Sequence, residues 1–109
     1  ELSRRLTNGE LFAMCYADLD HFKEFNDRYS YYDGDRVIRI LSKILHDVVK
    51  GVSGERGFVG HIGGDDFIFV IPVDDINATC AEIVHVFDLL IPFQYSEQDR
   101  RAGYFFGKD

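Results

Sequence analysis

Residues 58–71 read FVGHIGGDDFIFVI, in which two short apolar runs, Phe58–Ile62 and Phe67–Ile71, flank the sequence Gly63-Gly64-Asp65-Asp66. Paired glycines followed by aspartates favour a tight turn, because glycine adopts positive φ at little steric cost. The runs on either side have the length and the β-branched and aromatic content of strands. We therefore predict a β-hairpin with two acidic residues at its tip.

Upstream of this hairpin, the sequence predicts one strand and two helices. Leu11–Ala17 is a nearly continuous apolar run after Asn8-Gly9, and its length indicates a buried strand. In Phe22–Tyr29 the aromatic residues recur three and four positions apart, which predicts a short helix with one buried stripe. Asp33-Gly34-Asp35 then begins a longer helix that we expect to end at Gly51. Its predicted buried face carries Val37, Leu41, Ile44, Leu45 and Val48.

Downstream of the hairpin, Asp74-Asp75 supplies helix-capping residues, and Pro92 is expected to end the helix that follows. Apolar residues recur at helical spacing between them. We interpret 94–102 as a polar loop with a solvated charge run, and 103–106 as a fourth strand. The apolar positions of the predicted helix are Cys80, Ile83, Val84, Phe87, Leu90 and Ile91.

The predicted order is strand, helix, helix, strand, strand, helix, strand. Two helices on one face of a mostly antiparallel sheet make an α+β fold, close to the ferredoxin-like plan. In that plan the first strand is central and the hairpin pairs beside it. The end of the first strand can then lie beside the hairpin tip.

Acidic residues gather at that predicted edge, where Asp18-Leu19-Asp20 follows the first strand and Asp65-Asp66 forms the tip. Three or four converging carboxylates would repel one another unless a hard divalent cation, such as magnesium, relieved the repulsion. The chemistry of such an edge is metal-assisted phosphoryl or nucleotidyl transfer. Taken alone, however, Asp18-x-Asp20 is more often a solvated strand end, and Asp33-Gly34-Asp35 a helix cap.

Composition narrows the classes of partner. The chain of 109 residues carries a formal net charge of -7, which argues against nucleic acid or an anionic membrane surface as the main partner. The two cysteines, Cys15 and Cys80, are expected to be buried thiols in a reducing cytoplasm. The four histidines show no zinc spacing, and we expect no stretch to span a bilayer.

Several motifs together resemble the GGDEF domain of bacterial diguanylate cyclases. They are Asp18-Leu19-Asp20-His21-Phe22-Lys23, Asn26-Asp27, Gly34-Asp35 and Gly63-Gly64-Asp65-Asp66-Phe67, and their order and spacing match from about residue 12 to residue 72. The resemblance implies a nucleotidyl-cyclase-like fold and a single partial GGDEF domain over residues 1–109. The closing strand and last helix of the family are absent, and residues 1–6 read as the end of a helix, so we expect a piece of a longer protein.

The resemblance also implies an activity, the condensation of two GTP molecules into cyclic di-GMP with loss of pyrophosphate. Asp18, Asp65 and the backbone carbonyl of Leu19 would bind magnesium or manganese, and Asp65 and Asp66 would be catalytic, with Asp66 activating the ribose 3′-hydroxyl. The nucleotide-binding residues would be Phe22 and Lys23 at the triphosphate, Asn26 and Asp35 at the guanine edge, and Gly63 and Gly64 at the turn. A homodimer, flanking sensor or phosphodiesterase domains and a cytoplasmic location are expected.

The sequence departs from the family pattern at the fourth position of the signature, where Asp66 stands in place of glutamate. The carboxylate is then one methylene shorter. The alternative reading is therefore a degenerate GGDEF domain that binds GTP and serves as a regulatory or dimerisation module. Gly54 and Gly57 occupy the positions of the family's inhibitory Arg-x-x-Asp site, so product inhibition there is not expected.

Overall fold

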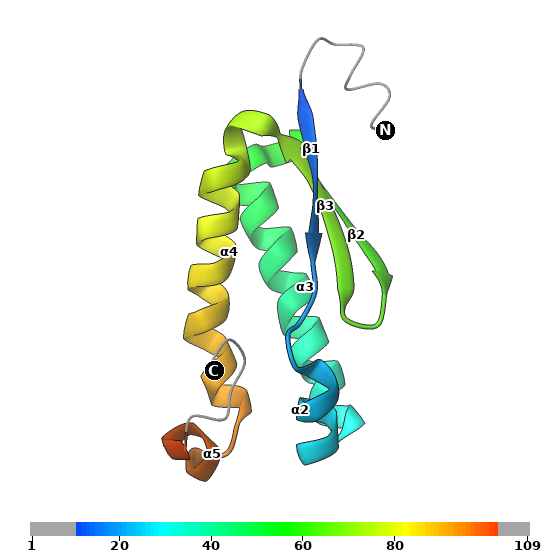
Figure 1. Ribbon diagram of the computed structural model, residues 1–109. Helices are drawn as coiled ribbons and strands as arrows, with labels where there is room; N and C mark the ends of the chain where they lie inside the picture. Colours follow the sequence, from blue (N-terminus) through cyan, green and yellow to red (C-terminus); the bar gives the residue numbers. More distant parts are fainter. Residues whose placement is uncertain (1–10, 103–109) are drawn as a thin grey trace.

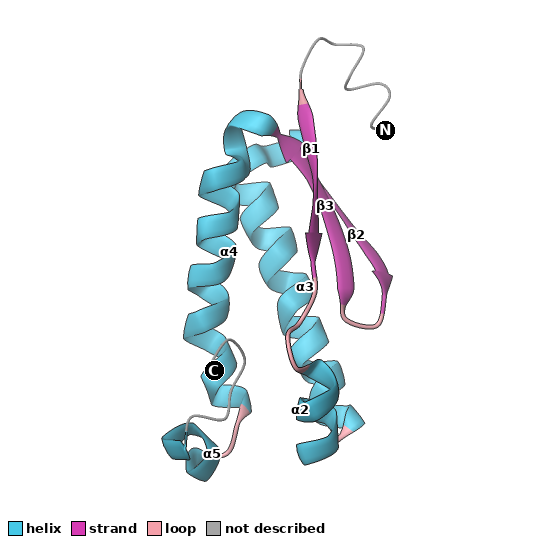
Figure 2. Cartoon of the chain, in the orientation of Figure 1, coloured by secondary structure: helices cyan, strands magenta, loops and turns pink. Residues whose placement is uncertain are grey.

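A computed structural model describes residues 11–102 of the chain (Figures 1 and 2). Three antiparallel strands form one sheet: β1 (Phe12–Ala17), β2 (Phe58–Gly63) and β3 (Asp66–Pro72). The predicted hairpin and first strand are confirmed to within one residue at each end. The helix predicted for residues 1–6 and the strand predicted for 103–106 lie outside the described residues.

In the described sheet β3 lies between β1 and β2, so the hairpin pairs beside the first strand as predicted. The predicted fourth strand, on which a central β1 depends, lies outside the described residues. Cross-strand partners run from Phe12 opposite Pro72 to Ala17 opposite Phe67. Most of β3 is buried, including Phe67, Phe69 and Ile71, as expected of a strand with neighbours on both sides. The expected pairing of the first strand antiparallel to a hairpin strand is confirmed.

The first two helices are α2 (Phe22–Arg28) and α3 (Tyr31–Ser53). Helix α3 begins earlier than predicted, because the Ser30 hydroxyl caps it by accepting a hydrogen bond of 3.1 Å from the Asp33 amide. It also continues past Gly51, the predicted end. A glycine inside a helix weakens it only modestly, and α3 ends at Gly54, which has φ of 60°.

The C-terminal half of the described chain contains α4 (Ile76–Leu90) and α5 (Glu97–Ala102). Short 3₁₀ turns follow α3, β3 and α4: η1 (Gly54–Arg56), η2 (Val73–Asp75) and η3 (Ile91–Gln94). The interpretation of 94–102 as a loop is wrong. The Ser96 hydroxyl accepts from the Asp99 amide at 3.1 Å, and Arg101 pairs with Glu97, so the charged run stabilises a short helix.

Helices α3 and α4 cover one face of the sheet (Figure 1). The core lies between these layers and contains the five residues predicted for the buried face of α3. Its members from α3 and β3 include Val37, Leu41, Leu45, Phe67, Phe69 and Ile71. On the other face of the sheet, Met14 and Tyr16 are exposed. The α+β fold with a ferredoxin-like arrangement is confirmed.

The membrane and cysteine expectations need correction. Between residues 11 and 102, one helical segment, Val73–Gln94, is long and apolar enough to span a bilayer by length and composition, although α4 within it packs on α3. Its buried fraction is only 11%. Cys15 and Cys80 are free thiols, but the expectation that both are buried is wrong, because Cys15 is half-buried and Cys80 is exposed. Burial raises the pKa of the Cys15 thiol, with a further contribution from Cys80.

Candidate functional site

The end of β1 and the tip of the β2–β3 hairpin lie at the same edge of the sheet (Figure 2). Because β1 and β3 are antiparallel and Ala17 lies opposite Phe67, Asp18 leaves the sheet where Asp66 enters it. The Leu19 amide donates a hydrogen bond of 3.2 Å to Oδ2 of Asp65. The structure therefore joins two motifs that are 46 residues apart in the sequence.

The hairpin tip has a defined conformation. Gly64 has φ of 52°, a left-handed value that favours glycine. The His61 Nε2–H donates to the Gly64 carbonyl at 2.8 Å, and the His61 ring stacks on Phe67 with 4.2 Å between centroids. Sequence reasoning gave His61 no role. Its contacts hold the turn that carries Asp65, while Gly63 and Gly64 remain exposed and open to a ligand.

The charge at this edge is negative. Partial desolvation raises the pKa of Tyr16, and the nearby carboxylates of Asp66, Asp18 and Asp65 raise it further. Three of the predicted site carboxylates therefore act on one hydroxyl. Asp18 is exposed, whereas Asp65 and Asp66 are half-buried.

The oxygen atoms at this edge suit a hard cation that also binds a substrate. In residues 11–102, no three His, Cys, Asp or Glu side chains are grouped to hold a metal by themselves, so the predicted convergence of three or four carboxylates into one metal cluster is not found. Magnesium, however, usually takes one or two carboxylates and completes its shell with water and phosphate oxygens. Asp18, Asp65 and the Leu19 carbonyl supply hard oxygen donors of that kind.

The predicted guanine-reading residues occupy the junction of α2 and α3, apart from the acidic edge. Asn26 is half-buried, and its Oδ1 atom is buried without a hydrogen-bond partner. That oxygen lies against Gly34, where an added Cβ would come within 1.8 Å of it. Asp35 and Lys23 are exposed, and Phe22 is half-buried beside Gly34. The short contact explains why glycine occupies position 34.

His21 turns the chain from β1 into α2. It stands at the N-terminus of α2 with φ of 59°, the one positive value of a non-glycine residue between 11 and 102. This left-handed turn places Phe22 and Lys23 directly after the acidic loop, at the start of the helix that carries Asn26.

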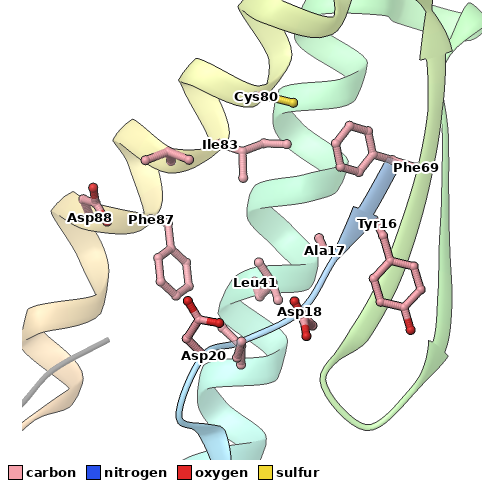
Figure 3. Close-up of a pocket in the computed structure, with 12 residues that line it drawn as sticks. Tyr16, Ala17, Asp18, Asp20, Leu41, Phe69, Cys80, Ile83, Phe87 and Asp88 are labelled. Carbon is pink, nitrogen blue, oxygen red and sulfur yellow. The ribbon is translucent and has the colours of Figure 1, made fainter. Parts of the chain in front are cut away.

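A cavity of about 360 Å³ lies between the end of β1, α3 and α4 (Figure 3). Sequence reasoning did not find it. Cys80, Ile83 and Phe87 point into it from α4, and Asp18 and Asp20 border it after β1. The helical spacing of the apolar residues of α4 was visible in the sequence. The cavity, however, depends on the distance between α4 and β1, and a sequence pattern does not give that distance.

The family profile described as "Diguanylate cyclase, GGDEF domain" matches residues 1–103. The chain belongs to the GGDEF family. Similar curated proteins include diguanylate cyclase DgcP of Pseudomonas aeruginosa, 28% identical over 78 residues, and diguanylate cyclase VdcA of Vibrio cholerae, 32% identical over 80 residues. The matches cover 72% and 64% of this chain but only 11% and 22% of those proteins.

Solved GGDEF structures share the fold. The GGDEF domain of DgcB from Caulobacter crescentus, in complex with c-di-GMP, superposes with a TM-score of 0.65 at 27% identity over 75% of this chain and 47% of that one. The active GGEEF domain of a diguanylate cyclase from Vibrio cholerae gives 0.64 at 26% identity, over 75% and 52% of the two chains. This GGDEF chain thus spans about half the length of these solved chains.

Proposed function

We propose that this GGDEF domain condenses two GTP molecules into cyclic di-GMP in a magnesium-dependent reaction. The observation that carries the proposal is the hydrogen bond from the Leu19 amide to Asp65, which unites the acidic loop after β1 with the glycine turn. Family membership supports cyclic di-GMP chemistry in general. The geometry supports the edge formed by the end of β1 and the hairpin tip as the place of the reaction.

Asp18, Asp65 and the Leu19 carbonyl would hold the cation, with manganese as an alternative to magnesium. When bound, the cation would neutralise phosphate charge and orient the triphosphate. Leu19 is 7% exposed, so its backbone is held by the core while its carbonyl belongs to the acidic loop. The Leu19 amide also restrains the Asp65 carboxylate before any ligand arrives.

Asp66 would accept the proton of the ribose 3′-hydroxyl as that oxygen attacks the α-phosphorus of the second GTP. One phosphodiester bond forms, and the bond to pyrophosphate breaks. Asp66 begins β3 opposite Gly63, so its backbone is fixed by the sheet.

The remaining predicted residues would bind the nucleotide. Asn26 and Asp35 would accept hydrogen bonds from the guanine N–H groups. Asn26 Oδ1 has no hydrogen-bond partner within the described residues and lies against Gly34, so the Asn26 side chain would turn to present it to the base. Lys23 and the backbone at Phe22 would contact the triphosphate. Gly63 and Gly64 would let the backbone approach it closely.

Two domains would be required for one product, since each brings one GTP. We propose a homodimer as the active form, in a bacterial cytoplasm where GTP is available. Sensor or phosphodiesterase domains would flank this domain and control it.

The second candidate is a degenerate domain that binds GTP without turnover and acts as a regulatory module. Asp66 favours it, because a misplacement of about 1 Å costs on the order of a hundredfold in rate. The test is an assay of the intact protein with GTP and magnesium that follows pyrophosphate and cyclic di-GMP, with Asp66→Asn as the inactive control. Turnover that Asp66→Asn abolishes supports the cyclase. GTP binding without product at any protein concentration supports the degenerate domain.

A further inference from the structure

Asp99 is a buried carboxylate in a segment that its composition marks as solvated, with only 5% of its surface exposed. It accepts hydrogen bonds from Arg28 Nε at 2.7 Å, from Arg28 Nη2 and from the Tyr29 hydroxyl. The Ser96 amide donates to that hydroxyl at 3.1 Å. These bonds, the one from Arg28 first, hold the pKa of Asp99 well below its usual range. Asp99 therefore fastens α5 to the end of α2.

A second set of contacts joins the same segment to the start of α3. Arg36 Nε donates to Gln94 Oε1 at 2.9 Å, and Arg36 also pairs with Asp33 at 3.1 Å. Between the two polar anchors, the buried Tyr95 ring packs edge-on against Phe25, with 5.1 Å between centroids, and against Tyr29, with 5.6 Å. Residues 91–102 thus hold both sides of the α2–α3 junction.

The anchored positions directly flank the two candidate guanine-reading residues. Arg28 and Tyr29 follow Asn26 within one helical turn, and Arg36 is the neighbour of Asp35 in the sequence. Asn26 and Asp35 come from different helices, so their separation depends on the angle between α2 and α3. Hydrogen bonding to a base tolerates little error in that separation.

We propose that residues 91–102 set the geometry of the guanine-reading junction, with Asp99 as the positioning residue. The inference rests on the proposed function, because it assigns the base to Asn26 and Asp35. In the Arg28–Asp99 pair the carboxylate is buried and the arginine side chain is half exposed, and the pair is bidentate and joined by a tyrosine hydroxyl. Such a pair fixes orientation, unlike the exposed single contact between Arg101 and Glu97 in the same helix. A helix that only covered the core would not need this directional pair.

The experiment compares GTP and ATP binding to the intact protein, to Asp99→Asn and to Tyr29→Phe. Glu97→Gln is the matched control, since it removes a carboxylate from the same helix without touching α2. We expect Asp99→Asn to reduce the preference for GTP over ATP about tenfold by weakening GTP binding, and Tyr29→Phe to reduce it less. Glu97→Gln should leave the preference unchanged. A role confined to stability would lower the melting temperature without changing the preference.

Hydrogen exchange of the same variants provides a readout that needs no nucleotide. Asp99→Asn should speed exchange of the backbone amides of α2 and the first turn of α3, and leave the hairpin 58–72 unchanged. If the wild type binds no GTP, the proposed function fails, and the guanine part of this inference fails with it. If the wild type binds GTP and Asp99→Asn keeps both its preference and its exchange pattern, the positioning role alone is overturned.

Discussion

The backbone amide of Leu19 donates a 3.2 Å hydrogen bond to Oδ2 of Asp65, across 46 residues of sequence. This bond connects the loop that follows β1 to a turn in which Gly64 has φ of 52°. A carboxylate held in this way is preorganised, since its position is fixed before a cation or phosphate binds. The acidic edge is therefore preformed by the fold, and it is separate from the α2–α3 junction where the base would bind.

Replacing Gly34 with alanine should destabilise the protein, although alanine normally favours a helix. An added Cβ would lie 1.8 Å from Asn26 Oδ1 and 3.2 Å from the Phe22 ring. We expect a loss of about 1–3 kcal/mol in the free energy of unfolding, measured with urea. Gly51→Ala in the same helix is the control. It meets nothing within 4 Å and should gain up to ~1 kcal/mol. Equal effects at both positions would contradict the contact.

Lengthening the Asp66 side chain should increase turnover if reach limits the reaction. Asp66→Glu restores the carboxylate of the family signature, and we expect up to a ~100-fold rise in pyrophosphate release. Asp74→Glu, an exposed change beyond the other end of β3, is the control and should have no effect. A fall in rate with Asp66→Glu would show that this site is built for the shorter acid.

Removing the Asp35 carboxylate should weaken the choice of base. It would accept from guanine N–H groups that adenine does not present in the same pattern, so Asp35→Ser should cost GTP about 1–3 kcal/mol relative to ATP. Competition binding with the two nucleotides measures this difference. Asp47→Ser removes an equal charge from an exposed site on α3 and should change nothing. An unaltered preference in Asp35→Ser would remove Asp35 from the guanine site.

The docking of α5 should weaken in acid. The pKa of Asp99 is held below its ordinary value of 3.8 by Arg28, the last residue of α2, and then by Tyr29, which follows it. Neither group titrates in this range. A depressed pKa stabilises the folded state above the unfolded value and loses that contribution as the pH falls. The difference in unfolding free energy between wild type and Asp99→Asn should be constant above about pH 5 and shrink below about pH 4. A difference independent of pH would show that the charge of Asp99 is not involved.

The features that were predictable from sequence depend on local chemistry. The glycine pair at 63–64 specifies the turn, and the apolar run before Asp18 specifies a strand. Once these two elements pair antiparallel, Asp18 and Asp65 must meet at one edge. The hairpin, the first strand and the acidic edge could therefore be predicted from the sequence.

The features that were missed depend on contacts between distant residues. Helix α5 is stabilised by Asp99 bound to Arg28, 71 residues away, and a mixed charge run gives no sign of such a partner. Gly51 looked like a helix end, but α3 continues through it to Ser53, because packing of the helix outweighs the modest cost of one glycine.

The most direct test of the acidic edge is calorimetric titration of GTP into the intact protein, with magnesium and with a chelator. We predict that wild-type protein binds GTP only with magnesium, that Asp18→Asn abolishes this binding, and that Asp74→Asn retains it. Equal GTP binding by wild type and Asp18→Asn, with or without the metal, would contradict a magnesium–nucleotide site at the end of β1.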